Sequence, residues 1–195
     1  MKSLRRLGKR FNSLDRLRDG LSGHERNKLF LNTDGQFVDL SGVSGCDDPA
    51  DGRAVVRLDY DRDGRLDLAI ANSGEPRFVL ARNEVPGAGH FVVVDVSGGN
   101  RSAEKTVDRS NRDGIGARIE ARLPNGRLLV REVCCGEGYA SQQSRYQHLG
   151  LGTESRIEQL TVRWPSGRKN VVADVPSGSL VVVTEDRPEV ELDAW

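Results

Sequence analysis

The stretch Arg57-Leu-Asp-Tyr-Asp-Arg-Asp-Gly-Arg-Leu-Asp-Leu-Ala-Ile70 places an acidic loop between two apolar flanks. Its aspartates recur at loop positions 1, 3, 5 and 9, the rhythm in which calcium loops present their oxygen ligands. They are Asp59, Asp61, Asp63 and Asp67. Gly64, at position 6, can take the backbone conformation that a Cβ would penalise. The carbonyl oxygen of Arg65, at position 7, is expected to face the same centre.

The flanks of this loop predict strands rather than the helices of an EF-hand. An EF-hand loop needs a bidentate Glu at position 12, where this chain has Ile70. Residues 53–58 and 66–71 are short, apolar and partly β-branched, with the alternation that favours strands. The acidic loop is therefore expected to connect two strands.

The loop has two interpretations. It can be an aspartate-rich hairpin turn, stabilised by hydrogen bonds from the backbone to the side chains without any ion. Alternatively it holds Ca²⁺, because four uncompensated carboxylates within nine residues repel one another when no cation is present. We favour the calcium site.

The overall composition excludes some classes of function. The 195 residues suit one large or two small domains, and 29 basic residues balance 29 acidic ones. No net field therefore favours nucleic acid or an anionic membrane. No run approaches the roughly 18 apolar residues of a transmembrane helix, and residues 1–20 lack the apolar segment of an export signal.

Charge is distributed unevenly along the chain. Residues 1–19 carry a net charge of +5, and their leucines recur at helical spacing, which predicts a basic amphipathic leader helix within residues 1–22. Such a helix can lie on a membrane or grip a partner, but more often it caps its own domain. Residues 34–67 carry a net charge of −5, and this acidic block contains the proposed ion site.

The segment 23–86 contains repeated strand patterns. Asp34-Gly35 between apolar runs predicts a hairpin. Residues 27–32 and 77–83 resemble each other, each an apolar strand ending in Asn, and this repetition suggests propeller blades. One blade and part of a neighbour leave open strand edges, through which the chain could self-associate.

The segment 87–186 predicts a second β domain. About six short strands alternate with turns such as Pro124-Asn125-Gly126, which is the pattern of a β-sandwich or barrel. Residues 187–195 are acidic and predict a frayed tail. The predicted fold is thus all-β: partial propeller blades and then a sandwich-like domain, preceded by a short helix.

Two families resemble these segments. Asn27-Lys-Leu-Phe-Leu-Asn32 and the acidic loop with its flanks are similar to FG-GAP/VCBS repeats. Arg131-Glu-Val-Cys-Cys-Gly-Glu-Gly-Tyr-Ala-Ser-Gln142, His148-Leu-Gly-Leu-Gly152 and Val162-Arg-Trp-Pro-Ser-Gly167 resemble the ASPIC/UnbV domain. This order of domains is that of the cartilage acidic protein family.

The resemblance implies a calcium site, a fold and a location. It implies calcium coordination by Asp59, Asp61, Asp63, the Arg65 carbonyl and Asp67, and an extracytoplasmic or secreted protein. The family usually has more repeats and an export signal, and we expect neither in this chain.

No catalytic motif emerges from the chain, so we expect a protein that is not an enzyme. The nucleophile elbow, the Walker loop and the dinucleotide fingerprint are all missing. His148 could be a polar group of a ligand site, but a hydrogen bond to the backbone is the more ordinary role. Cys134 and Cys135 are adjacent, and one buried and one exposed thiol are expected.

Two functions remain open. The first is a non-enzymatic calcium-binding β module for adhesion or extracellular recognition, with an unidentified protein or glycan partner. The second is a carbohydrate-binding or carbohydrate-active domain in which Trp164, Tyr139 and Tyr146 stack on sugar rings. Trp164 ends an alternating run, however, so the edge of the core suits it better.

Overall fold

The computed structural model describes residues 25–187 and 190–195. These residues form thirteen strands and one four-residue helix, α2 (Ser41–Ser44), which confirms the all-β prediction. The leader helix predicted within residues 1–22 lies outside the described residues. In the part of the chain that is described, no helix has the length and apolarity to cross a membrane.

Contacts between Cα atoms divide the chain into two compact units. Unit 1 takes its described residues from the segments 25–58, 67–83 and 138–141. Unit 2 takes its described residues from the segments 59–66, 84–137, 142–187 and 190–195. The acidic loop between residues 59 and 66 is thus grouped with unit 2, although the strands on either side of it belong to unit 1.

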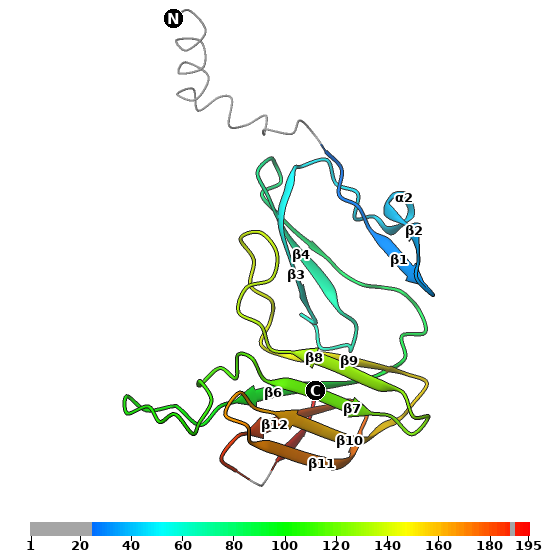
Figure 1. The fold of residues 1–195 in the computed structure, drawn as a ribbon. Helices are drawn as coiled ribbons and strands as arrows, with labels where there is room; N and C mark the ends of the chain where they lie inside the picture. Colours follow the sequence, from blue (N-terminus) through cyan, green and yellow to red (C-terminus); the bar gives the residue numbers. More distant parts are fainter. Residues whose placement is uncertain (1–24, 188–189) are drawn as a thin grey trace, which may run out of the picture. The chain divides into compact units, whose positions relative to one another are not determined.

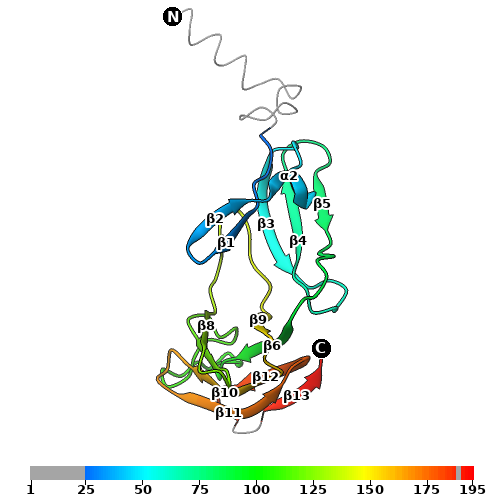
Figure 2. The ribbon, with the colours of Figure 1, turned by 90° about the vertical axis from the view of Figure 1, so that its right-hand side faces the viewer.

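Unit 1 is built from two small antiparallel sheets (Figure 2). In the first, β1 (Phe30–Thr33) pairs with β2 (Gln36–Asp39) around the predicted Asp34-Gly35 turn. The second has the order β3 (Gly52–Leu58), β4 (Asp67–Asn72), β5 (Phe78–Ala81). β3 and β5 are therefore the two outer strands of a three-stranded sheet.

Unit 1 buries few of its apolar side chains. Ala50 and Ile70 are its buried hydrophobic residues among those described. Large apolar side chains on its strands and on α2 are exposed instead: Phe30, Leu31, Phe37, Val38, Val43, Val55, Phe78 and Leu80. Exposed apolar surface of this kind favours association with another surface.

Unit 2 is a β-sandwich of two four-stranded sheets (Figure 1). One sheet has the order β11 (Lys169–Pro176), β10 (Arg156–Arg163), β7 (Arg118–Arg122), β8 (Leu128–Glu132). The other has the order β13 (Glu191–Ala194), β12 (Ser179–Thr184), β6 (His90–Ser97), β9 (Gln147–Gly152). The neighbours in both sheets are antiparallel, except for the parallel pair of β6 and β12.

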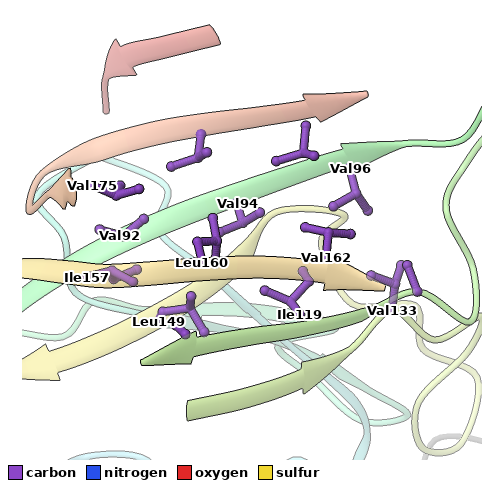
Figure 3. Close-up of a cluster of buried hydrophobic side chains, with 14 of the residues drawn as sticks. Val92, Val94, Val96, Ile119, Val133, Leu149, Ile157, Leu160, Val162 and Val175 are labelled. Carbon is purple, nitrogen blue, oxygen red and sulfur yellow. The ribbon is translucent and has the colours of Figure 1, made fainter. Parts of the chain in front are cut away.

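One hydrophobic core joins the two sheets of unit 2. Alternate residues of β12 are buried, and so are alternate residues of β7, because successive side chains of a strand point to opposite faces. Figure 3 shows side chains from both sheets pointing toward one another, among them Val94 of β6, Leu149 of β9 and Leu160 of β10. This core stabilises the sandwich that the sequence predicts for this half of the chain.

Two strands of the sandwich differ from the predictions. The segment 187–195 was expected to fray, but Glu191–Ala194 forms β13 and pairs with β12. The ladder to an apolar strand outweighs the low strand propensity of its acidic residues. β9 was not predicted either, because Gly150 and Gly152 weaken the strand signal of an otherwise apolar segment.

Glu185 is a buried carboxylate, 5% exposed, that follows β12. It accepts hydrogen bonds from the backbone N–H of Gly99 at 2.7 Å and of Ser110 at 2.8 Å. The hydroxyls of Ser110, at 2.9 Å, and Ser166 also donate to it. Burial alone would raise the pKa of Glu185, but these hydrogen bonds outweigh burial and hold the pKa below the ordinary value of 4.5.

Replacing Glu185 by Gln should destabilise unit 2. The amide cannot accept all four hydrogen bonds, and donors that it leaves unpaired cost about 3 kcal/mol in free energy of unfolding. Since the pKa of Glu185 is lowered on folding, its contribution is present above pH 4.5 and is lost as the pH falls through the folded pKa. Urea unfolding as a function of pH, followed by tryptophan emission, measures both effects.

Glu158→Gln is the matched control, because Glu158 is an exposed residue of β10. The control should unfold like the parent protein. Equal stability of the Glu185→Gln variant and the parent at pH 7 would show that this carboxylate does not hold its neighbouring loops.

Candidate cation-binding loop

The acidic loop is closed by the register of two paired strands. Leu58 of β3 lies opposite Asp67, the first residue of β4, so the intervening residues form the loop of a hairpin. Gly64 has a φ of +86°, the left-handed conformation expected for position 6. The prediction that the acidic loop connects two strands is confirmed.

Three of the predicted ligands lie together. Asp59, Asp61 and Asp67 each offer a carboxylate oxygen within 4.8 Å of the others. Oxygen ligands of one Ca²⁺ lie about 2.3–2.6 Å from the ion, so two of them are at most about 5 Å apart. The spacing of the three carboxylates therefore fits a shared cation of this size.

Asp63 and Arg65 interact with each other instead. The guanidinium of Arg65 forms an ion pair with Asp63 Oδ2, and the Arg65 backbone N–H donates to Asp63 Oδ1 at 2.9 Å. Asp63 is therefore not in the group of converging carboxylates. Coordination through the Arg65 carbonyl remains a prediction.

Backbone hydrogen bonds hold two of the converging carboxylates. Asp59 accepts from the N–H groups of Asp63 at 3.1 Å and Gly64 at 2.9 Å. Asp67 is 1% exposed and accepts from the N–H of Asn83 at 2.7 Å. Hydrogen bonds of this kind were expected for a plain turn, but here they accompany the convergence of the carboxylates that a cation needs.

Within unit 2, the loop is anchored by an imidazole. His148 Nε2 lies 2.9 Å from the carbonyl oxygen of Gly64, and the His148 ring stacks on Phe91 at 5.2 Å between centroids. The distance fits an N–H donor on Nε2. Burial lowers the pKa of His148 below the ordinary 6.5, although the bond to Gly64 and the charge of Asp59 raise it.

This arrangement confirms the ordinary role expected for His148, a hydrogen bond to the backbone. Sequence reasoning missed that the bond reaches the acidic loop, because 84 positions separate the two residues. It also missed Trp195, whose indole N–H donates to Asp59 Oδ2 at 2.6 Å. The only signal in the sequence for this contact was the position of Trp195 after an acidic segment.

The remaining candidate side chains are distributed over unit 2 and the segment near residue 139. Trp164 was expected at the edge of the core. It is buried in the core cluster and donates from Nε1 to Asn170 at 2.6 Å. Tyr139 and Tyr146 are exposed. Cys134 and Cys135 are both exposed, which corrects the expectation of one buried thiol, because β8 ends at Glu132 before either cysteine.

Comparison with known proteins concerns unit 2. Residues 107–190 match the family model described as ASPIC and UnbV, and the match spans β7 to β12. No curated protein matches the chain. The resemblance to ASPIC/UnbV is thus confirmed for this part of the chain.

Replacing Gly64 by Ala should disrupt the loop. A Cβ at Gly64 would lie 2.1 Å from Cε1 of Phe91, and the Phe91 ring is held by its stacking on His148. Backbone strain and overpacking together should lower the free energy of unfolding of unit 2 by about 3 kcal/mol. Urea unfolding followed by emission of the two tryptophans, both in unit 2, measures this loss.

Gly126→Ala is the matched control. Gly126 has a φ of +82° in the β7–β8 turn, but nothing lies within 4 Å of a Cβ added there. Backbone strain alone should cost about 1 kcal/mol. Equal losses for the two variants would contradict the close packing of Phe91 against the loop.

Proposed function

We propose that this protein is a non-enzymatic calcium-binding β module for adhesion or extracellular recognition. The observation that carries the proposal is the convergence of Asp59, Asp61 and Asp67 within a loop closed by paired strands. Hard oxygen ligands in a loop of this kind suit Ca²⁺. The resemblance of segment 23–86 to FG-GAP/VCBS propeller repeats supports the same proposal.

Calcium would act on the shape of the loop. Two positive charges on the ion offset the repulsion among the three carboxylates, so ion binding and folding of the loop are coupled. Extracellular calcium modules often bind with a Kd on the order of 10⁻⁴ to 10⁻³ M. A site of that strength would be filled outside a cell, which agrees with the extracytoplasmic location that we propose.

Recognition would use the exposed strands of unit 1. Its sheets expose large apolar side chains, and β5 is an edge strand of the three-stranded sheet, where a further strand could pair. Both features favour binding to another protein surface. We propose that a second copy of this chain can pair there.

Calcium should raise the melting temperature of the protein. At 10 mM Ca²⁺ and a Kd on the order of 10⁻⁴ M, the gain of about 2.7 kcal/mol corresponds to a rise of roughly 5 to 10 °C. Asp61→Asn should abolish the rise, because Asp61 is exposed and its carboxylate converges with the other two. Differential scanning calorimetry with calcium and with excess chelator measures the shift.

Asp34→Asn serves as the control, since Asp34 is an exposed residue of the β1–β2 turn, where Asn tolerates the left-handed φ of +51°. This variant should keep the full calcium response. Identical melting curves of the parent protein in calcium and in chelator would refute the calcium proposal.

Self-association should weaken when a lysine is placed on the edge of unit 1. Leu80, 42% exposed on the edge strand β5, is the position to change, because a charged side chain there opposes strand pairing. Val171→Lys is the control, since Val171 is 49% exposed on β11, an edge strand of unit 2. Light scattering after size exclusion, over a range of concentrations, gives the mass of each variant.

The parent protein and Val171→Lys should form dimers at high concentration, whereas Leu80→Lys should remain monomeric. A monomeric parent protein at every concentration would exclude pairing between chains. Equal dimerisation of Leu80→Lys and the parent would place the contact elsewhere.

A further inference from the structure

Trp195 is held next to the acidic loop by contacts that all lie in unit 2. Its backbone N–H donates to the carbonyl of Gly178 at 3.0 Å, directly after the pairing of β13 with β12. The ring packs edge-on to Tyr146, with 5.3 Å between centroids and an angle of 71°. The guanidinium of Arg62 lies 5.5 Å from the Trp195 ring centroid, in the range of a cation–π contact.

The two carboxylate oxygens of Asp59 accept hydrogen bonds from different donors, and Trp195 bonds to only one of them. Oδ2 accepts from Trp195 Nε1 at 2.6 Å and from the Gly64 N–H at 2.9 Å. Oδ1 accepts from the Asp63 N–H at 3.1 Å. A carboxylate oxygen has two lone pairs, so Oδ2 is fully used, whereas Oδ1 keeps a lone pair for a ligand.

We propose that Trp195 is a positioning residue of the cation site, which holds Asp59 so that Oδ1 alone faces the ion. This inference rests on the proposed function, and it goes further by assigning Asp59 as a monodentate ligand. Partners that orient a metal ligand typically change metal affinity 10- to 100-fold when they are removed. Trp195 belongs to this kind of partner, because it touches the ligand and not the ion.

The arrangement also couples the ion to β13. Trp195 continues directly from β13, and its ring contacts both Asp59 and Arg62 of the loop. An ion that stabilises this geometry of Asp59 therefore stabilises the docking of Trp195 as well. By linkage, loss of the Trp195 contact must weaken binding of the ion by the same free energy with which the ion stabilises that contact.

Calcium titration by calorimetry tests the role of Trp195. Trp195→Phe keeps an aromatic ring against Tyr146 and Arg62 but removes the indole N–H, so its Kd for Ca²⁺ should rise about tenfold. Leu192→Ala is the matched control, because Leu192 is 47% exposed on β13 and pairs with Val181 rather than with the loop. Urea unfolding of each variant in chelator reports any loss of stability independently of the ion.

The two variants separate positioning from simple stability. A tenfold weaker Kd for Trp195→Phe, with Leu192→Ala unchanged, supports the proposal. Equal Kd values for Trp195→Phe and the parent overturn it while the calcium site stands. The proposal is also overturned if both variants bind calcium more weakly in proportion to the stability that each loses in chelator. A parent protein that binds no calcium refutes the proposed function, and the role of Trp195 falls with it.

Spectroscopy gives a second reading of the same contact. The sequence has two tryptophans, so Trp195 is the single emitter in Trp164→Phe. Calcium should change its emission with the midpoint found by calorimetry, because the charge of its hydrogen-bond partner Asp59 becomes neutralised. Calcium binding by calorimetry without any change in this emission would overturn the proposed contact.

Discussion

Electrostatic repulsion among carboxylates in a short loop is the constraint on which the proposed site depends. The register of β3 and β4 sets Leu58 opposite Asp67, which forces the ends of the loop together. Asp59, Asp61 and Asp67 consequently present oxygens within 4.8 Å of one another. Hydrogen bonds from the backbone relieve part of the repulsion at Asp59 and Asp67. A divalent cation would relieve more, and in doing so it would stabilise the loop.

The second constraint is the packing of the loop among side chains of unit 2. Gly64 must lack a Cβ because the Phe91 ring occupies that space, and the carbonyl of Gly64 is bonded to His148. Trp195 holds Asp59 from another direction. The carboxylate geometry is thus imposed by residues far away in the sequence, and a rigid support of this kind favours a defined coordination site.

The sequence predicted the elements whose signals are local. Asp34-Gly35 and Pro124-Asn125-Gly126 specify hairpins through their turn chemistry, and the strands around both turns form as expected. The alternating run that ends at Trp164 predicted a place at the edge of the core, and the side chain is buried within the core cluster. The spacing of the aspartates predicted a convergence of carboxylates, which the structure shows for Asp59, Asp61 and Asp67. Their coordination of an ion stays a prediction.

Elements with nonlocal causes escaped sequence reasoning. The pairing of Asp63 with Arg65 competes with ion coordination, and spacing alone does not reveal that competition. The acidic residues of β13 have low strand propensity, so its sequence gives no strand signal. The strand forms because it pairs with β12. The contact of Trp195 with Asp59 joins positions 136 residues apart. Only the folded sandwich brings them together.

A crystal structure determined in millimolar calcium tests the central claim most directly. Anomalous scattering should show Ca²⁺ about 2.3–2.6 Å from oxygens of Asp59, Asp61 and Asp67, with Asp59 coordinating through Oδ1. Well-ordered density containing only water among these carboxylates would contradict a calcium site in this loop.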